Sequence, residues 1–130
     1  MPQKEIEVIL ARQLAEYLAV PIFIVDPDGD LLYYNEPGEL ILGSRYDETG
    51  PMSANDLAAI FKTVDQDDQP VKPDELPLVI AMTHKRPDHG SLWIQGLDGS
   101  LRKIAITAFP IIGQANRFLG AIAIFWEVPR

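Results

Sequence analysis

The first apolar pattern along the chain repeats every three to four residues over positions 3–19, "QKEIEVILARQLAEYLA". This spacing places one stripe along a helix, and the stripe is apolar except at Gln13. Its members are Ile6, Ile9, Leu10, Gln13, Leu14, Tyr17 and Leu18. The segment has no glycine or proline, and Pro21 ends it because the residue before a proline is pushed out of helical geometry. The pattern predicts an amphipathic helix over 1–19, followed by a domain over 20–130.

Beyond Pro21 the apolar residues come in short runs of β-forming side chains, separated by turn signals. The run "IFIV" precedes "DPDGD" at 26–30, and "LLYY" follows it. An Asp-Gly pair between two such runs is a strong hairpin signal, because both residues tolerate the backbone angles of tight turns. We therefore expect a hairpin with strands at 22–26 and 31–35.

The alternating aspartates of this turn also resemble the front half of a calcium-binding loop. Asp26, Asp28 and Asp30 stand at the first, third and fifth loop positions. The sixth position, where glycine makes a sharp turn, is Leu31, and the twelfth, where a glutamate binds through both oxygens, is Pro37. Both flanks also predict strands, where a calcium site needs helices. The sequence therefore favours a hairpin turn with solvated aspartates over a metal site.

The middle of the chain alternates helical and polar segments. "EPGELILG" at 36–43 and "SANDLAAIF" at 53–61 predict short helices, and the proline- and aspartate-rich stretch 63–73 predicts a loop. A third helix starts near Asp74 and carries Pro77 in its first turn, where proline is tolerated.

The last third of the chain predicts strands. A second Asp-Gly pair, Asp98-Gly99, interrupts the β-rich run over 90–111, and 117–128 forms the closing strand. Strict alternation places Phe118, Gly120, Ile122, Ile124 and Trp126 on one face, which we expect to look toward the short helices, and Leu119, Ala121, Ala123 and Phe125 on the other. Both faces are largely apolar. The short helices must therefore cover one face, and the N-terminal helix or a second subunit must cover the other.

Composition narrows the class of protein. The chain has 130 residues, of which 47% are hydrophobic, enough for one domain with one core. No apolar run reaches the length of about 20 residues that spans a membrane. The first ten residues carry charges inside their apolar stretch, which argues against a secretory signal, so we expect a cytoplasmic protein without membrane contact. A formal net charge of −8 repels phosphate backbones, so nucleic acid is not an expected partner.

Taken together, the order of the segments resembles a PAS domain, a small sensory module of bacterial signalling proteins. "PIFIVDPDGDLLYYNEPGELILG" is similar to the first PAS hairpin and its following helix, with Asn35 after the second strand. "DELPLVIAMTHKRP" resembles the long helix of the family, and "LDGSLRKIAITAFPI" and "FLGAIAIFWEV" resemble its closing strands. The resemblance implies an α+β fold with a five-stranded antiparallel sheet and short helices on one face. It also implies a ligand pocket between helices and sheet, and an N-terminal helix that often dimerises.

The flavin and other chromophores of that family can be weighed against the residues. The chain has no cysteine, which excludes cysteine-linked chromophores and photochemical flavin sites. The stretch "ANRFLG" at 115–120 is similar to the flavin motif but lacks its cysteine. Family members that bind flavin without this cysteine often carry polar amides on the strands that face the flavin ring. The matching positions here are Ile94, Ile104 and Ile122, whose side chains cannot form hydrogen bonds.

Haem and metal ions have little support in the sequence. The histidines are His84, near the end of the third helix where haem-binding members take their ligand, and His89. His84 beside Lys85 and Arg86 is more simply a basic helix end that opposes the helix dipole. Two histidines and scattered carboxylates are too few for a zinc site. We therefore expect no cofactor.

No motif in the sequence indicates an enzyme. There is no serine nucleophile motif and no glycine-rich phosphate loop. A curved-sheet enzyme of the ketosteroid-isomerase type needs a buried acid facing its pocket, which Asp26 or Asp30 in a turn does not supply. A purely structural dimerisation module stays open as an alternative.

The sequence therefore predicts a PAS sensor or interaction domain of a signal-transduction protein such as a sensor histidine kinase, working as a homodimer that signals to an output domain. The resemblance places a pocket for a small apolar ligand among Tyr34, Leu92, Ile94, Ile104, Ile106, Ile122, Ile124 and Trp126. The helical stripe predicts a dimer interface of Ile6, Ile9, Leu10, Leu14, Tyr17 and Leu18. Glu127-Val128-Pro129 stands where family members carry an Asp-hydrophobic-Thr motif that couples to the output.

Overall fold

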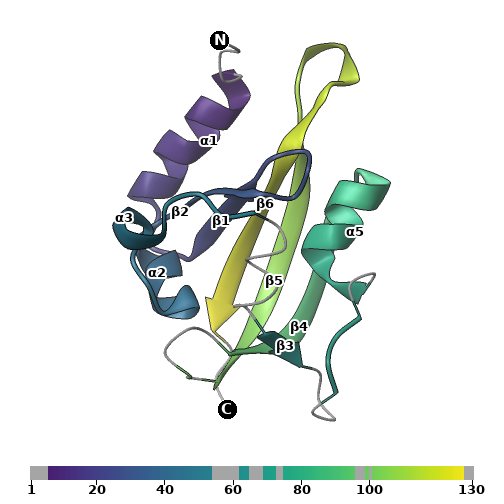
Figure 1. Ribbon diagram of the computed structural model, residues 1–130. Helices are drawn as coiled ribbons and strands as arrows, with labels where there is room; N and C mark the ends of the chain where they lie inside the picture. The colour runs from purple at the N-terminus through teal and green to yellow at the C-terminus, as the bar shows by residue number, and fades with distance from the viewer. Residues whose placement is uncertain are drawn as a thin grey trace.

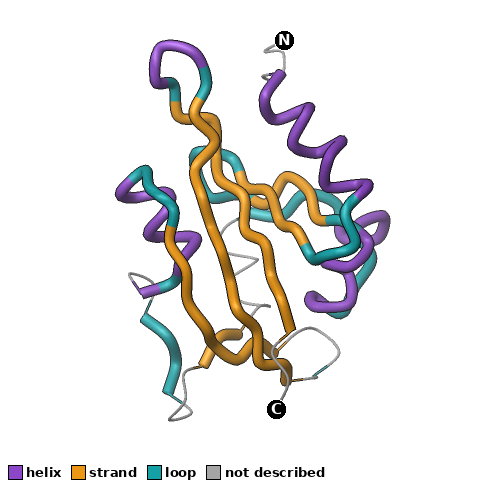
Figure 2. The backbone as a smooth tube through the Cα atoms, turned by 180° about the vertical axis from the view of Figure 1, so that it is seen from behind, coloured by secondary structure: helices purple, strands orange, loops and turns teal. Residues whose placement is uncertain are grey.

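The computed structural model shows an antiparallel sheet with helices on both faces (Figure 1). The described residues are 6–53, 62–64, 69–72, 75–95, 99 and 101–127. Helix α1 (Ile6–Tyr17) lies on one face and α5 (Pro77–His84) on the other, and Figure 2 shows this arrangement from behind. The short helices α2 (Glu36–Leu42) and α3 (Tyr46–Thr49) follow the first hairpin.

Within the described residues the sheet has six strands in the order β2-β1-β6-β5-β4-β3, and every neighbouring pair is antiparallel. The strands are β1 (Ile22–Val25), β2 (Leu31–Tyr34), β3 (Lys62–Val64), β4 (Asp88–Gln95), β5 (Leu101–Ile112) and β6 (Phe118–Glu127). Strand β6 joins the two halves of the sheet, because it pairs with β1 on one side and β5 on the other. The predicted α+β fold is confirmed.

The sheet has one strand more than the five expected. Edge strand β3 takes Thr63 and Val64 out of the stretch 63–73 that the sequence predicted as a loop. Thr63 pairs with Ile94 and Val64 with Trp93 on β4. These β-branched residues fit a pleated edge, and the pairing is complete before the aspartate-rich part of the segment begins.

The predicted first hairpin is confirmed, but one of its aspartates does more than meet solvent. Gly29 has a positive φ of 86°, which glycine adopts without strain. The Asp26 Oδ1 atom accepts hydrogen bonds from the backbone amides of Asp28 at 2.9 Å and Asp30 at 3.0 Å. The Asp26 side chain therefore closes the turn.

Helix α2 forms as the sequence predicted. The Asn35 side chain accepts a hydrogen bond from the Gly38 amide and caps the first turn. Gly43 ends the helix in the left-handed conformation, with φ of 87°. Both helix ends are thus specified by single residues close in sequence.

The other helices differ from expectation at their ends or were not expected. Helix α5 starts at Pro77, later than predicted, and α3 was not predicted. Some expectations fall outside the described residues: the helix over 53–61 apart from Ser53, the helix start at Asp74, the turn position Asp98, and Val128-Pro129.

Two apolar cores lie on the two faces of the sheet. The core between the sheet and helices α2 and α5, called here the inner core, includes Phe23, Tyr34, Leu42, Ala81 and Phe125. The core between the sheet and α1, called here the outer core, consists of Ala15, Ile22, Ile24, Ile111 and Leu119, with partly buried neighbours around them. Helix α1 therefore covers part of the outer face of its own sheet.

From Ala121 onward, the side chains of β6 point to the faces opposite to those expected, whereas Leu119 lies on the expected face. Ala121, Ala123 and Phe125 belong to the inner core, and Ile122 and Ile124 pack on the outer core. The Phe23 ring stacks on Tyr34 and on Phe125, with centroid distances of 5.4 and 5.0 Å. Ala123 pairs with Phe23, and its small side chain leaves room for this aromatic stack.

A β-bulge breaks the strict alternation at the start of β6. The register against β5 shifts after Ile111, which pairs with Gly120, and Leu119 is the extra residue. Leu119 therefore packs on the same face as Ile122. Gly120 has φ of +134°, and a Cβ atom there would lie 2.1 Å from the carbonyl oxygen of Val25. The bulge accordingly depends on glycine at this position.

Candidate functional site

Asn35 lies where α1, β1 and α2 meet, and it is the one buried polar residue among those described. Its Nδ2 atom donates hydrogen bonds to the carbonyl oxygens of Ala15 at 3.0 Å and Val20 at 2.8 Å. Its Oδ1 atom accepts hydrogen bonds from the amides of Ile22 and Gly38, each at 3.0 Å. The side-chain amide thereby uses both donor hydrogens and both lone pairs. One residue ties the end of α1 to the rest of the domain.

The side of α1 that packs on the outer core holds the helix against its own sheet. Ala15 is buried, and Val8 and Ala11 pack against the outer core. The Arg12 guanidinium lies 4.5 Å from the ring centroid of Tyr33, within the range of a cation–π contact. Small side chains and one stacked arginine thus fix the position of α1.

The opposite face of α1 is apolar and exposed. The exposed fractions are 65% for Ile6, 41% for Ile9, 55% for Leu10, 60% for Leu14, 85% for Tyr17 and 38% for Leu18. These residues are the ones for which the sequence predicted a dimer interface, and they are called here the α1 stripe. None of them belongs to the outer core or is packed against it, and their pairing with a second chain stays a prediction.

The predicted ligand-pocket residues divide between the two faces of the sheet. Tyr34, Leu92, Ile94, Ile104 and Ile106 are buried in the inner core, on the face that α5 covers. Ile122 and Ile124 pack on the outer core, and Trp126 is 43% exposed. Assigning these three to the pocket was wrong, because β6 turns them away from α2 and α5, toward the face that α1 partly covers. Ile122 is wrong as a flavin-facing position for the same reason.

The Tyr34 hydroxyl is held by α3 and the segment before it. It donates a hydrogen bond to the carbonyl oxygen of Ser44 at 3.1 Å and lies 2.7 Å from Thr49 Oγ1. Burial raises the pKa of Tyr34, and the hydrogen bond with Thr49 partly offsets this increase. Tyr34 therefore joins the inner core to the chain that follows α2.

Neither histidine lies in a core. His84 and His89 are both exposed, and His89 Nδ1 lies 3.0 Å from Thr107 Oγ1 on the neighbouring strand. Within the described ranges, His, Asp and Glu side chains form no group of three or more that could hold a metal ion. No helix of the described part of the chain has the length and apolar character needed to cross a membrane.

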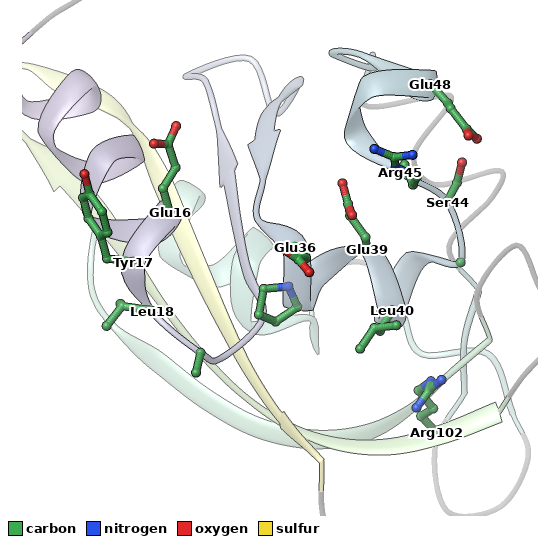
Figure 3. Close-up of a pocket in the computed structure, with 13 residues that line it drawn as sticks. Glu16, Tyr17, Leu18, Glu36, Glu39, Leu40, Ser44, Arg45, Glu48 and Arg102 are labelled. Atoms are coloured by element: carbon green, nitrogen blue, oxygen red, sulfur yellow. The ribbon is translucent and has the colours of Figure 1, made fainter.

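A groove that the sequence did not reveal opens beside the end of α1. Its volume is about 840 Å³, and its walls come from residues 16–19, the α2–α3 segment and Arg102 (Figure 3). Exposed apolar side chains from Tyr17, Leu18 and Leu40 line it. These elements are distant in sequence, so no local pattern could have indicated that they form one surface.

The fold is that of PAS domains. A PAS domain from a Colwellia psychrerythraea protein matches with a TM-score of 0.65 at 15% identity, over 93% of this chain and 96% of that one. The PAS domain of nitrogen regulation protein NR(II) from Vibrio parahaemolyticus matches with 0.64 at 15% identity, over 92% and 98%. The LOV protein of Rhodobacter sphaeroides matches with 0.70 at 13% identity, over 97% and 70%. No protein-family model and no curated protein sequence matches this chain, so the likeness is one of fold.

Proposed function

We propose that this chain is the sensor or interaction domain of a cytoplasmic signal-transduction protein. In this proposal it works as a homodimer and passes its signal to an output domain such as a histidine kinase. The PAS fold supports this role, and the similar structures include PAS domains of nitrogen regulation protein NR(II) and of a two-component sensor histidine kinase. Its role is binding and signalling rather than catalysis.

The exposed α1 stripe carries the proposal. Full burial of one large apolar side chain stabilises a protein or complex by about 1.5–3 kcal/mol. The stripe cannot be buried on its own sheet, because Val8, Ala11 and Ala15 already occupy that contact. A second copy of α1 offers an equally apolar surface, and two-fold pairing buries both stripes together.

The charges around the stripe are compatible with self-pairing. Gln13, at the centre of the stripe, is exposed and uncharged, so its amide can form hydrogen bonds across a two-fold axis. Arg12 and Glu16 face each other within one helix, with 3.9 Å between Arg12 Nε and Glu16 Oε1. The charge of Glu16, beside the stripe, therefore has a partner within its own helix.

The contacts of α1 provide a route for the signal. Asn35 binds the last turn of α1 and the first turn of α2, and Ile41 and Leu42 of α2 are buried in the inner core. A change of packing in that core moves α2, and with it Asn35 and the end of α1. Such a movement changes the angle between the two α1 helices of a dimer. It thereby favours one of two packing arrangements of the dimer over the other.

For the inner core we propose a small apolar ligand. The side chains that β4 and β5 present there are Leu92, Ile94, Ile104 and Ile106, which offer dispersion contacts and no directed hydrogen bonds. A curved-sheet enzyme would need a buried carboxyl group in this place. Among the described residues the buried polar group is the Asn35 amide, whose hydrogen-bonding groups are all engaged.

Sedimentation of the full chain at micromolar concentrations tests the dimer. We expect a dimer for the unmodified protein and a monomer for the double variant Leu10→Glu/Leu14→Glu. Leu40→Glu is the matched control, because Leu40 is at least as exposed as Leu10 and Leu14 but lies on α2, outside the stripe. A monomeric unmodified protein, or a double variant that stays dimeric, contradicts the proposal.

Native mass spectrometry of the purified protein then separates a ligand-binding sensor from a ligand-free dimerisation module.

A further inference from the structure

The groove beside α1 has an apolar centre that the fold of the described residues does not use. Leu40 lies on the solvent-facing side of α2, where it is 68% exposed although it is a large apolar residue. Leu18 lines the groove at the end of α1, on the other side from Leu40, and Tyr17 lies beside Leu18 (Figure 3). Apolar side chains packed on Leu18 and on Leu40 would remove both from water.

Acidic side chains surround this apolar centre. Glu16, Glu36, Glu39 and Glu48 line the groove, against Arg45 and Arg102. Both arginines have other partners, since Arg45 Nη2 lies 3.3 Å from Asp47 Oδ2 and Arg102 Nη1 lies 2.5 Å from Glu127 Oε1. The negative charge of the rim is therefore not neutralised by the arginines that lie in it.

The carboxylates differ in how far they are engaged. Glu39 Oε2 accepts a hydrogen bond from the Tyr46 amide at 2.9 Å, so Glu39 serves the fold. Glu36 and Glu48 are exposed, and no described cation lies within ion-pair distance of either. These two carboxylates are in position to meet positive charges brought by a partner.

We propose that this groove is a docking site for a basic, leucine-bearing segment of a partner protein. Apolar side chains of the segment pack on Leu18 and on Leu40, and its Lys or Arg residues pair with Glu36 and Glu48. An apolar anchor surrounded by a charged rim is the common arrangement of energetically important contacts in protein interfaces. The acidic rim excludes phosphate-bearing partners and favours encounter with basic ones.

The groove shares Tyr17 and Leu18 with the proposed dimer interface, but its other walls lie outside that interface. Leu40, Glu36 and Glu48 lie on α2 and α3, and none belongs to the α1 stripe. The walls of the groove are joined by Asn35, which bonds to Ala15 and Val20 on one side and to Gly38 on the other. A segment bound in the groove therefore contacts both elements that Asn35 connects.

The test is a titration of the ¹⁵N-labelled protein with the peptide acetyl-KLKLRL-amide, in which binding is followed by the amide chemical shifts. We expect saturable shifts confined to residues 16–19 and 36–48, and no such shifts with acetyl-ELELEL-amide. Leu40→Asp and Glu36→Lys should each weaken binding about ten-fold. Asp28→Lys is the matched control for charge, since Asp28 is exposed in the distant β1–β2 turn, and it should leave the affinity within about two-fold.

Three outcomes overturn the proposal. Shifts spread over the whole acidic surface, with equal losses for Glu36→Lys and Asp28→Lys, indicate non-specific attraction. Shifts confined to the α1 stripe place the peptide on the dimer interface instead. Sedimentation of the Leu40→Asp variant tests for the third outcome. If this variant becomes monomeric, the groove is a contact between two copies of the chain and not a docking site for another protein.

Discussion

Asn35 Nδ2 donates a hydrogen bond to the carbonyl oxygen of Ala15 over 3.0 Å, so the residue that caps α2 also holds the last turn of α1. The two residues are 20 positions apart in sequence. The bond matters because most of the packing of α1 on the sheet comes from small side chains. Loss of the Asn35 amide should therefore affect the position of α1 more than the rest of the fold.

Asn35→Ala should lower the free energy of unfolding by about 3 kcal/mol or more, because it leaves several buried donors and acceptors without partners. Urea denaturation followed by circular dichroism measures the change. Gln114→Ala serves as the control, since Gln114 is exposed between β5 and β6, and it should change stability by less than about 0.5 kcal/mol. Equal effects of the two substitutions would contradict the role given to Asn35.

Asn35→Asp separates the two halves of the same network. A carboxylate keeps the acceptor for Gly38 and Ile22 but loses the donor for Ala15 and Val20, and it faces their carbonyl oxygens. Hydrogen exchange should therefore speed up in α1 and stay slow in α2. Equal acceleration in both helices would show that Asn35 does not act on α1 in particular.

Gly120→Ala should destabilise the protein severely, whereas Gly99→Ala should cost only about 1 kcal/mol. Both glycines have positive φ, but a Cβ at Gly120 meets the Val25 carbonyl oxygen at 2.1 Å, and a Cβ at Gly99 meets no atom of the described residues within 4 Å. Comparing the melting temperatures of the two variants separates the cost of a positive φ in alanine from the cost of a steric clash. Similar melting temperatures would contradict the bulge geometry of β6.

Tyr34 should give the protein an alkaline limit of stability. Burial raises the pKa of its hydroxyl above the ordinary value of 10.0, so the folded state favours the neutral form. The stabilisation is fully present below pH 10.0 and is lost as the pH rises through the raised pKa. Melting temperatures between pH 9 and 11.5 should fall less steeply for Tyr34→Phe. Some dependence should remain, because burial also raises the pKa of Tyr33.

Calcium should leave the stability unchanged. Asp26 Oδ1 is engaged by two backbone amides of its own turn, and the loop lacks the sixth-position glycine and twelfth-position glutamate of a calcium loop. Thermal melts with and without millimolar calcium should coincide. A rise in melting temperature that Asp28→Ala abolishes would overturn the hairpin assignment.

Local elements could be predicted from the sequence because their causes lie within a few residues. The Asp28-Gly29 pair determines the first turn, where Gly29 adopts positive φ. Asn35 and Gly43 determine the start and end of α2 through its own backbone groups. The spacing of apolar residues over 3–19 determined α1 and its exposed stripe, since helical periodicity alone places those side chains on one face.

The tertiary structure decided which partner each element meets. Alternation along β6 left its two faces indistinguishable, and only the aromatic stack around Phe23 and the bulge at Gly120 assign Ala123 to one and Ile122 to the other. The hydrogen bond from Asn35 to Ala15 and the groove between Leu18 and Leu40 likewise require segments that the folded chain brings together. Hydrophobic periodicity and turn chemistry depend on residues close together in sequence. Steric fit and burial depend on contacts between distant elements, and the sequence pattern does not indicate which distant elements will meet.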